Sequence, residues 1–309
     1  MTFRCSEAVL LIGFNRPELL AEVIERIRVV APPRVYLAVD GPRPDRQGEV
    51  DKVRACQELA SSIDWNCEVF TLFREQNLGC GRGVSGAITW FFEREERGII
   101  LEDDILPAPD FFPYVEAMLD AHATDPQVAC VTGTNFIPPA DQSDSTTPRL
   151  TRVPLVWGWA TWRRVWNEYD FDIAGWREGW DASAMKYAMG GTRPAKLLWS
   201  ANFDLMARHA IDTWDLQFVY ACMRRNHLTV APPVNLVANV GFHADATHTR
   251  RRPRYLRETE TFTLSDSCPQ AELDERADRW LMRQVYEASY PGLVRLATRY
   301  VKRMVKRKS

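Results

Sequence analysis

Two hydrophobic patterns alternate over the first 135 residues of the chain. Runs of consecutive apolar residues predict buried strands, and apolar residues recurring every three or four positions predict amphipathic helices. Leu20, Val23 and Ile27 share one such helical face, and Asn15 with Glu18 resembles a capping box at its start. The predicted buried strands cover residues 8–14, 35–40, 67–73, 98–102 and 128–133. This alternation predicts an α/β fold with a mostly parallel sheet covered by helices on both faces.

The pattern changes after residue 135. A loop-like segment, PPADQSDSTTPR, is followed by the tryptophan-rich LVWGWATWRRVW and by helical patterns at 193–211 and 214–226. LTVAPPVNLVANVGF then predicts a returning strand pair interrupted by prolines. We therefore expect two halves, residues 1–135 and 136–260, and a C-terminal helical extension over residues 261–309.

Composition narrows the class of protein. Of 309 residues, 46% are apolar and 26% charged, which is ordinary for a soluble globular protein. No apolar run reaches the roughly 18–20 residues needed to span a bilayer, and the first apolar run is too short for a signal peptide. The seven cysteines form no C-x-x-C pair, which argues against a disulfide framework or a zinc site. We expect a cytoplasmic protein.

Charge is unevenly spread along the chain. The net charge is -2, but from residue 288 on there are seven Lys/Arg and no Asp/Glu. An acidic body argues against nucleic acid as a partner. The basic tail places Leu293 and Tyr300 on one helical face, which predicts an interfacial helix at the inner, anionic face of a membrane. A docked terminal helix is the alternative.

Polar residues follow three of the predicted strands. Asn15 and Arg16 follow the first strand, Asp40 follows the second, and Glu102 to Asp104 end the fourth. Ligands of mostly parallel sheets bind at the carboxyl ends of the strands. We therefore expect the three clusters to converge on one edge.

Gly81-x-Gly83-x-x-Gly86, with an acidic cluster about twenty residues later, resembles the fingerprint of a dinucleotide-binding turn. That fingerprint normally follows the first strand directly. Here two strand–helix units precede it, and residues 74–78 separate it from the third strand. This position disfavours an NAD-dependent dehydrogenase. The sequence leaves two alternatives, glycines that admit a ligand and glycines at a close helix–strand crossing.

Three consecutive carboxylates end the fourth predicted strand. Glu102, Asp103 and Asp104 repel one another, and leaving them unpaired in a partly desolvated place is costly. A hard divalent cation, Mn²⁺ or Mg²⁺, relieves that cost. Alternation along the strand predicts Glu102 and Asp104 on one face and Asp103 on the other. The competing interpretation is a solvated acidic turn that caps the helix near Asp110.

The segment GIILEDDILPAPDFF resembles the metal-binding acidic motif, of the D-x-D class, of GT-A nucleotide-sugar glycosyltransferases. Its three-carboxylate form is similar to that of N-acetylglucosaminyltransferase I and its bacterial relatives. FNRPELL, VDGPR, NLGCGRGVSGAITWFFE, WGWATWRRVW and TWDLQF follow the order found in those relatives, over residues 8 to about 248.

The resemblance implies a GT-A-like fold whose Rossmann-like first half binds a nucleotide sugar and whose second half binds the acceptor. It also implies a Mn²⁺- or Mg²⁺-dependent, inverting transfer of a sugar. The donor would be a nucleotide-diphosphate sugar, UDP favoured, and the acceptor hydroxyl would belong to a glycan, a glycolipid or a small molecule.

Residue roles follow from the same resemblance. Asp40 would hold the nucleobase, Asp103 would approach the ribose, and Asp104 would bind the metal with His248. Glu102 would orient the donor sugar. The further donor-site candidates are Asn15, Arg16, Asn77, Arg82 and Trp159. Trp157 is the alternative to Trp159 for stacking on a sugar ring.

Asp215 matches the position of the carboxylate that takes the acceptor proton; Asp170, Asp212 and Glu168 are the reserves. Each candidate also has a structural interpretation. Asp40 suits a turn, Asp215 suits the first turn of a helix, and His248 suits a solvated loop.

Three other functions stay open on the sequence. A sugar-phosphate nucleotidyltransferase shares the sheet and the metal, but it needs a Gly-rich phosphate loop after the first strand, which GFNRPE lacks. The others are an NAD-dependent dehydrogenase and a non-catalytic sugar- or membrane-binding protein.

Overall fold

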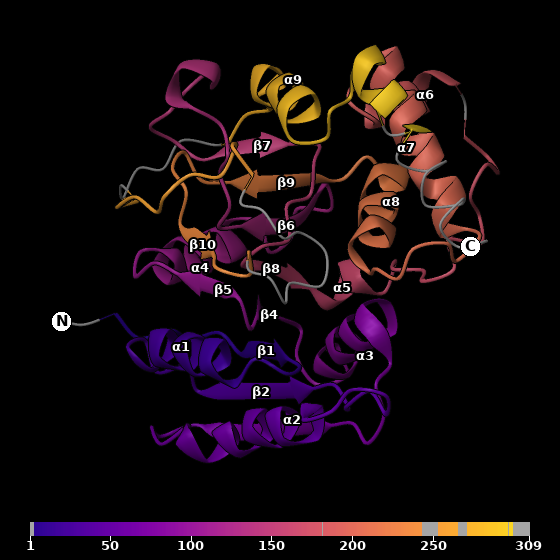
Figure 1. Cartoon of the computed structure of the whole chain (residues 1–309). Coiled ribbons are helices and arrows are strands. Elements are labelled where there is room, and N and C mark those ends of the chain that lie inside the picture. The colour runs from indigo at the N-terminus through magenta and orange to yellow at the C-terminus, as the bar shows by residue number, and fades with distance from the viewer. Residues whose placement is uncertain (1–2, 181, 243–252, 265–270, 296, 299–309) are drawn as a thin grey trace.

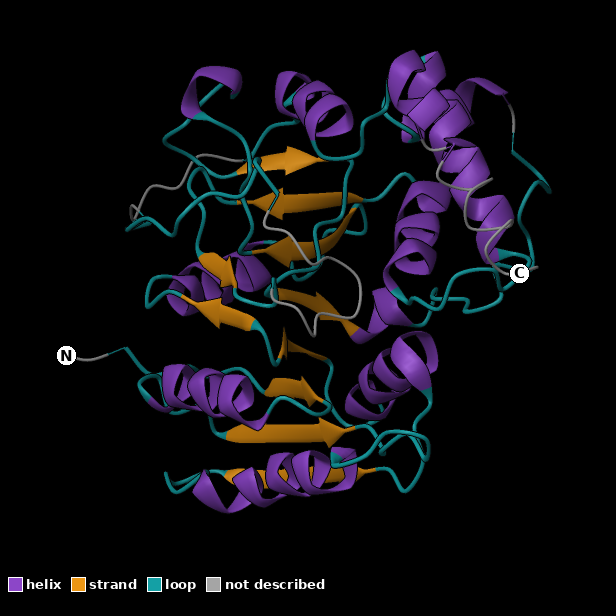
Figure 2. Ribbon diagram, in the orientation of Figure 1, coloured by secondary structure: helices purple, strands orange, loops and turns teal. Residues whose placement is uncertain are grey.

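The computed structural model describes residues 3–180, 182–242, 253–264, 271–295 and 297–298 (Figure 1). It is a mixed α/β structure with an eight-stranded, mainly parallel central sheet flanked by helices (Figure 2). The strand order is β3-β2-β1-β4-β8-β6-β9-β7. The strands of this sheet are β1 (Val9–Gly13), β2 (Arg34–Val39), β3 (Glu68–Phe73), β4 (Arg97–Glu102), β6 (Val128–Thr132), β7 (Arg149–Thr151), β8 (Trp159–Trp162) and β9 (Leu228–Ala231).

A second, two-stranded sheet pairs β5 (Ile105–Pro107) with β10 (Val237–Asn239). The α-helices are α1 (Pro17–Arg28), α2 (Glu49–Glu58), α3 (Gly79–Phe92), α4 (Phe111–Ala121), α5 (Arg163–Trp166), α6 (Ala182–Ala188), α7 (Arg193–Met206), α8 (Asp215–Arg225) and α9 (Glu275–Gln284). Short 3₁₀ helices cover Leu59–Ser62 and Pro139–Asp141.

The strand order reverses at β1. The chain passes from β1 to β2 and β3 on one side, then returns through α3 to β4 on the other side of β1, and all these pairs are parallel. The backbone N–H of Asp103 donates to the carbonyl of Ile12 (2.9 Å), and that of Asp40 donates to the carbonyl of Gly13 (3.1 Å). The polar segments after β1, β2 and β4 therefore meet at this switch point, where doubly wound sheets leave a crevice for ligands.

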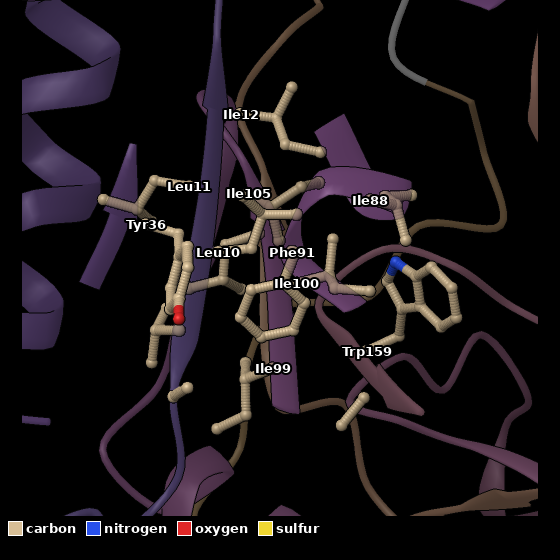
Figure 3. Close-up of a cluster of buried hydrophobic side chains, with 14 of the residues drawn as sticks. Leu10, Leu11, Ile12, Tyr36, Ile88, Phe91, Ile99, Ile100, Ile105 and Trp159 are labelled. Atoms are coloured by element: carbon tan, nitrogen blue, oxygen red, sulfur yellow. The ribbon is translucent and has the colours of Figure 1, made fainter. Parts of the chain in front are cut away.

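The predicted buried strands form the core around β1. All five residues of β1 are buried, and Leu10, Leu11 and Ile12 pack with residues of β4 and α3 such as Ile100 and Phe91 (Figure 3). Strands covered on both faces need apolar side chains on both, which is why these segments lack a polar alternation.

The prediction of a buried strand at 67–73 was wrong in its burial. The segment forms β3, which lies at the edge of the sheet, and the side chains of Val69 and Phe73 are 38% and 39% exposed. The predicted pairing within residues 228–242 was also wrong. β9 joins the central sheet between β6 and β7, whereas β10 pairs with β5, and Pro232–Pro233, which lack backbone N–H donors, separate the two.

The predicted capping box at α1 does not form. The helix begins at Pro17, whose fixed φ suits the first helical position, and the N-cap residue Arg16 makes no side-chain capping bond. The Asn15 amide instead donates to Glu49 Oε1 of α2 at 2.8 Å. Asn15 therefore bonds to a residue of another helix instead of capping α1.

A second hydrophobic cluster lies beside the first, built from α7, α8 and α9 around Trp199, Phe203 and Leu281. Asp274 caps α9 by accepting from Ala277 N (3.0 Å), and it also accepts from Ser143 N (2.7 Å). Part of the C-terminal extension is thereby anchored to the second half. The boundaries at 135 and 260 stay a prediction.

Among the described helices, none is long and apolar enough to cross a membrane. Residues 290–295 and 297–298 are helical. His248 and residues 299–309 of the basic tail lie outside the described residues, so the metal role of the histidine and the membrane contact of the tail stay predictions.

Candidate functional site

A cavity of about 650 Å³ lies at the carboxyl ends of β1, β2 and β4. Part of its lining comes from the segments that follow these strands and from the first turns of α3. The rest comes from residues 156–157, 211–216 and 239–242, and the two sets are in contact where Asp212 accepts from Cys80 N and Gly81 N. The predicted convergence of the three polar clusters is confirmed, because members of all three line this one cavity.

The acidic turn is held by one arginine. Arg16 donates from Nη2 and Nε to the Asp103 carboxylate and from Nη1 to Asp104 Oδ2 at 2.8 Å. Phe14 N also donates to Asp103, at 3.4 Å. The strand geometry behind the predicted alternation ends at Glu102, and both aspartates of the following turn contact Arg16. Asp103 is nevertheless buried, whereas Glu102 and Asp104 are partly exposed.

The acidic turn at residues 102–104 carries more negative charge than Arg16 offsets. Burial raises the pKa of Glu102 well above its ordinary value, and the nearby carboxylates of Asp104, Asp103 and Asp215 raise it further against the opposing charge of Arg16. Burial likewise raises the pKa of Asp103 despite its pairing with Arg16. One arginine thus faces three carboxylates.

These residues fit a hard divalent cation. Glu102 and Asp104 both line the cavity, and Mg²⁺ characteristically takes one or two protein carboxylates together with substrate phosphate oxygens. Across the described residues there is no ready-made group of three or more His, Cys, Asp or Glu side chains for a metal.

Asp40 is more than a turn residue. Its carboxylate accepts from Asn77 Nδ2 (2.9 Å), Leu78 N (3.1 Å) and Gly41 N (3.0 Å), while it lines the cavity. Burial raises its pKa, and these N–H groups and Arg74 oppose the rise. The result is a carboxylate held in one orientation at the end of β2.

The glycine-rich stretch lies inside α3 rather than before it, since the helix begins at Gly79. A Cβ atom at Gly79 or Gly81 would lie 2.5 or 2.8 Å from the carboxylate of Asp212. That carboxylate accepts from Cys80 N (3.0 Å) and Gly81 N (2.8 Å), and so satisfies free N–H groups at the positive end of the helix.

The other two glycines admit further cavity-lining side chains. A Cβ at Gly83 would lie 3.1 Å from Asp40 Oδ2, and one at Gly86 would lie 2.7 Å from the Arg74 guanidinium. The groups that approach these glycines are side chains, which neither a ligand contact nor a helix–strand crossing had predicted. The glycines allow a close approach, but the approaching groups are side chains of the protein's own cavity wall.

We expect Asp212→Ala to lower the free energy of unfolding by about 1 kcal/mol, because α3 loses the acceptor at its N-terminus. Urea denaturation monitored by circular dichroism measures this change. Asp172→Ala is the matched control, since that carboxylate is exposed and its partners Arg82 and His209 lie 4.0 and 3.8 Å away. Equal effects of the two substitutions would contradict a capping role for Asp212.

Asp215 occupies the first turn of α8 on the cavity wall. Its Oδ1 accepts from the Thr213 hydroxyl and from Leu216 N (2.9 Å), which orients the carboxylate. Of the reserves, Asp212 lines the cavity as the cap of α3. Asp170 and Glu168 bond elsewhere and are not part of the cavity wall.

Two predicted donor-site residues lie away from the cavity. Trp159 is 1% exposed and stacks on Trp214 at 5.6 Å within the core, because it is part of strand β8 (Figure 3). Arg82 projects from α3 into solvent, where its guanidinium lies 4.4 Å from the ring centroid of Phe171. A tryptophan in a central strand packs inward, and Arg82 lies on a different side of α3 from Gly83.

Sequence reasoning missed Arg74, and it named Trp157 only as the alternative to Trp159; both Arg74 and Trp157 line the cavity. Arg74 directly follows β3, so it could have been selected for the same reason as Asp40, as a polar residue at the carboxyl end of a strand. Trp157 lies two positions before Trp159, and nothing in the sequence separates the half-buried ring from the buried one. Asn15, Arg16 and Asn77 do line the cavity.

No protein-family model and no curated protein sequence matches the chain. It is similar in structure to S. aureus TarS (residues 1–349), at 12% identity and a TM-score of 0.36, over 53% of this chain and 49% of that one. The chain thus spans about half the length of that structure. GalNAc-T7 with UDP, GalNAc and Mn²⁺ is 11% identical, with a TM-score of 0.43, over 74% and 43% of the two chains. The inositol-1-phosphate CTP transferase from T. maritima is 10% identical, with a TM-score of 0.30, over 53% and 73%.

Proposed function

We propose that the protein is a metal-dependent glycosyltransferase that moves a sugar, with inversion, from a nucleotide-diphosphate donor to an acceptor hydroxyl. One observation carries the proposal. Asp40, the acidic turn at residues 102–104, and Asp215 line a single cavity at the switch point of the sheet. UDP is the favoured nucleotide, as the family resemblance implies.

The donor would lie along the wall formed by β1, β2 and β4. Asp40, oriented by Asn77, would accept from the N–H of the nucleobase. Asp103, fixed by Arg16, would approach the ribose. Arg16 acts in this scheme as a positioning residue, because it ties the ribose side of the site to Asp104.

Asp104 would hold Mn²⁺ or Mg²⁺, together with His248, the further ligand that the family resemblance implies and that lies outside the described residues. When bound, such a cation offsets the charge of the departing diphosphate. Glu102, whose crowded carboxylate lines the cavity, would orient the donor sugar.

The first turn of α8 would supply the base. Asp215 would take the proton of the acceptor hydroxyl as the hydroxyl oxygen forms a bond to the anomeric carbon. The bond from that carbon to the diphosphate breaks in the same displacement, and the nucleoside diphosphate leaves with the bonding pair. A single displacement inverts the anomeric centre and needs no protein nucleophile.

Thermal-shift measurements with UDP, GDP, dTDP and NADH, each with Mn²⁺ or with EDTA, test the proposal. A ligand at about 100 times its Kd stabilises the folded state by about 2.7 kcal/mol. We expect one nucleoside diphosphate, UDP first, to raise the midpoint with Mn²⁺ only. Stabilisation by NADH alone, with Mn²⁺ and with EDTA alike, would instead support the dehydrogenase. Turnover of a nucleoside triphosphate with a sugar phosphate would support the nucleotidyltransferase.

A further inference from the structure

The acidic turn at residues 102–104 is also held from the second half of the chain. β10 pairs antiparallel with β5, the strand that follows the turn, and the two lie side by side with Asn239 opposite Ile105 (Figure 1). One residue further on, Val240 N donates to the Asp104 carbonyl at 2.9 Å. The backbone of Asp104 is therefore fixed by a segment that is distant in the sequence.

The next residue, Gly241, lies against the side chain of Asp104. A Cβ atom at Gly241 would lie 2.9 Å from Asp104 Cγ and nearer still to Oδ2, which is inside van der Waals contact. The φ angle of Gly241 is not in the left-handed region. Space for the carboxylate, rather than backbone conformation, therefore requires glycine at this position.

The segment that carries Gly241 is anchored on both sides of β10. Gly241 N donates to Asn239 Oδ1 at 2.9 Å, so the amide of Asn239 closes a turn with the backbone two residues on. At the start of β10, the buried side chain of Val237 fills the space beside Gly133 and Gly158, where a Cβ atom would lie 2.8 or 2.6 Å from its Cγ1. The segment has little freedom to retreat, so a side chain at position 241 would displace the carboxylate instead.

The place of this carboxylate matters for a divalent cation. Mg²⁺ takes only one or two protein carboxylates together with phosphate oxygens, so each protein ligand contributes a large share of the binding. Arg16 Nη1 donates to Asp104 Oδ2 at 2.8 Å, and the same oxygen faces Gly241. Both Asp104 and Gly241 line the cavity.

We propose that Gly241 is a positioning residue for the divalent cation. By presenting no side chain, it keeps open the place that the Asp104 carboxylate occupies, and the pairing of β10 with β5 fixes that place from the second half of the chain. This inference rests on the proposed function, in which Asp104 binds the cation.

Binding of Mn²⁺ to Gly241→Ala tests the proposal. Electron paramagnetic resonance counts the unbound ion, and the titration is made at a saturating concentration of the nucleoside diphosphate that stabilises the wild type, UDP first. We expect the Mn²⁺ Kd to rise about 10- to 100-fold, the usual effect of removing a group that orients a metal ligand. Raising the Mn²⁺ concentration by the same factor should restore the stabilisation by UDP. A Mn²⁺ Kd equal to that of the wild type would overturn the proposal.

Gly190→Ala is the matched control for a general loss of stability. Gly190 has a φ of 89°, and its added methyl would lie 2.9 Å from Met282 Cγ in the second hydrophobic cluster, outside the cavity lining. This substitution should lower the urea midpoint and leave the Mn²⁺ Kd unchanged. Equal increases of the Mn²⁺ Kd in the two variants would contradict a positioning role for Gly241.

A double-mutant cycle tests the contact without any ligand. Asp104→Ala removes the carboxylate that a methyl at position 241 would meet. Gly241→Ala should therefore lower the urea midpoint less in the Asp104→Ala background than in the wild type, because residues in contact are not additive. A Gly241→Ala variant that folds only in the Asp104→Ala background would support the same contact. Equal losses in both backgrounds would overturn it.

The wild-type protein separates this inference from the proposed function. If no nucleoside diphosphate binds together with Mn²⁺, the proposed function fails and takes the metal role of Gly241 with it. If the wild type binds both but the Mn²⁺ Kd is unchanged in Gly241→Ala, the inference about Gly241 alone fails.

Discussion

Replacing Asp215 by asparagine should lower the rate of sugar transfer by about 10²- to 10⁴-fold, the usual contribution of a positioned general base. The amide has the shape of the carboxylate, and its oxygen can still accept from the Thr213 hydroxyl and Leu216 N. It cannot take a proton from an acceptor hydroxyl at neutral pH. Initial rates of transfer with saturating donor and acceptor measure the effect.

Two comparisons make this result specific to the base. Stabilisation by the nucleoside diphosphate and Mn²⁺ should persist in Asp215→Asn, because Asp215 lies on α8 and is not among the residues proposed to hold the nucleotide or the cation. Asp170→Asn is the matched control, since the Asp170 carboxylate accepts from Ala174 N at 2.7 Å and lies outside the cavity wall. If Asp215→Asn kept more than about a tenth of the wild-type rate, another group would have to be the base.

The second large effect concerns the metal. At a nucleoside diphosphate concentration of about 100 Kd, Asp104→Ala should reduce the stabilisation measured with Mn²⁺ from about 2.7 kcal/mol to below about 0.5 kcal/mol. The reason is that Asp104, which lines the cavity beside Glu102, is the carboxylate proposed to hold the cation, and the cation would offset the charge of the diphosphate. Thermal or urea unfolding with and without ligand measures the difference.

In this experiment, the stability of each variant with ligand has to be compared with the stability of the same variant without ligand. Removing Asp104 also takes one negative charge from a site where Glu102 and Asp103 already have raised pKa values, so the unliganded protein can itself change in stability. Asp120→Ala removes an exposed carboxylate outside the cavity and is the control. Full Mn²⁺-dependent stabilisation in Asp104→Ala would exclude this residue as the metal ligand.

Sequence patterns predicted best the strands that are buried on both faces. Residues 8–14 and 98–102 became β1 and β4, because an apolar run without alternation can be satisfied only in a strand buried on both faces. The pattern could not separate a central strand from the edge strand β3. Burial there depends on whether another strand lies alongside, and that neighbour is distant in sequence.

The donor side of the candidate site could be predicted because ligands of mostly parallel sheets bind at the carboxyl ends of the strands. Asp40, Arg16 and the acidic turn meet because parallel strands place their carboxyl ends on one edge, whatever the packing around them. Arg74 also follows a strand and was open to prediction. His248, outside the described residues, stays a prediction.

Contacts between distant segments decided the rest. The glycines of α3 alone do not reveal that Asp212, more than 120 positions later, caps the helix they open. Nor does a tryptophan-rich segment reveal which ring faces solvent. The sequence by itself determined the alternation of strands and helices in the first half and the acidic character of the strand ends, because these depend on local periodicity and residue type. Only the tertiary structure decided that Arg16 neutralises Asp103 and that Trp157 rather than Trp159 lines the cavity, because such pairings depend on the positions of side chains far apart in the chain.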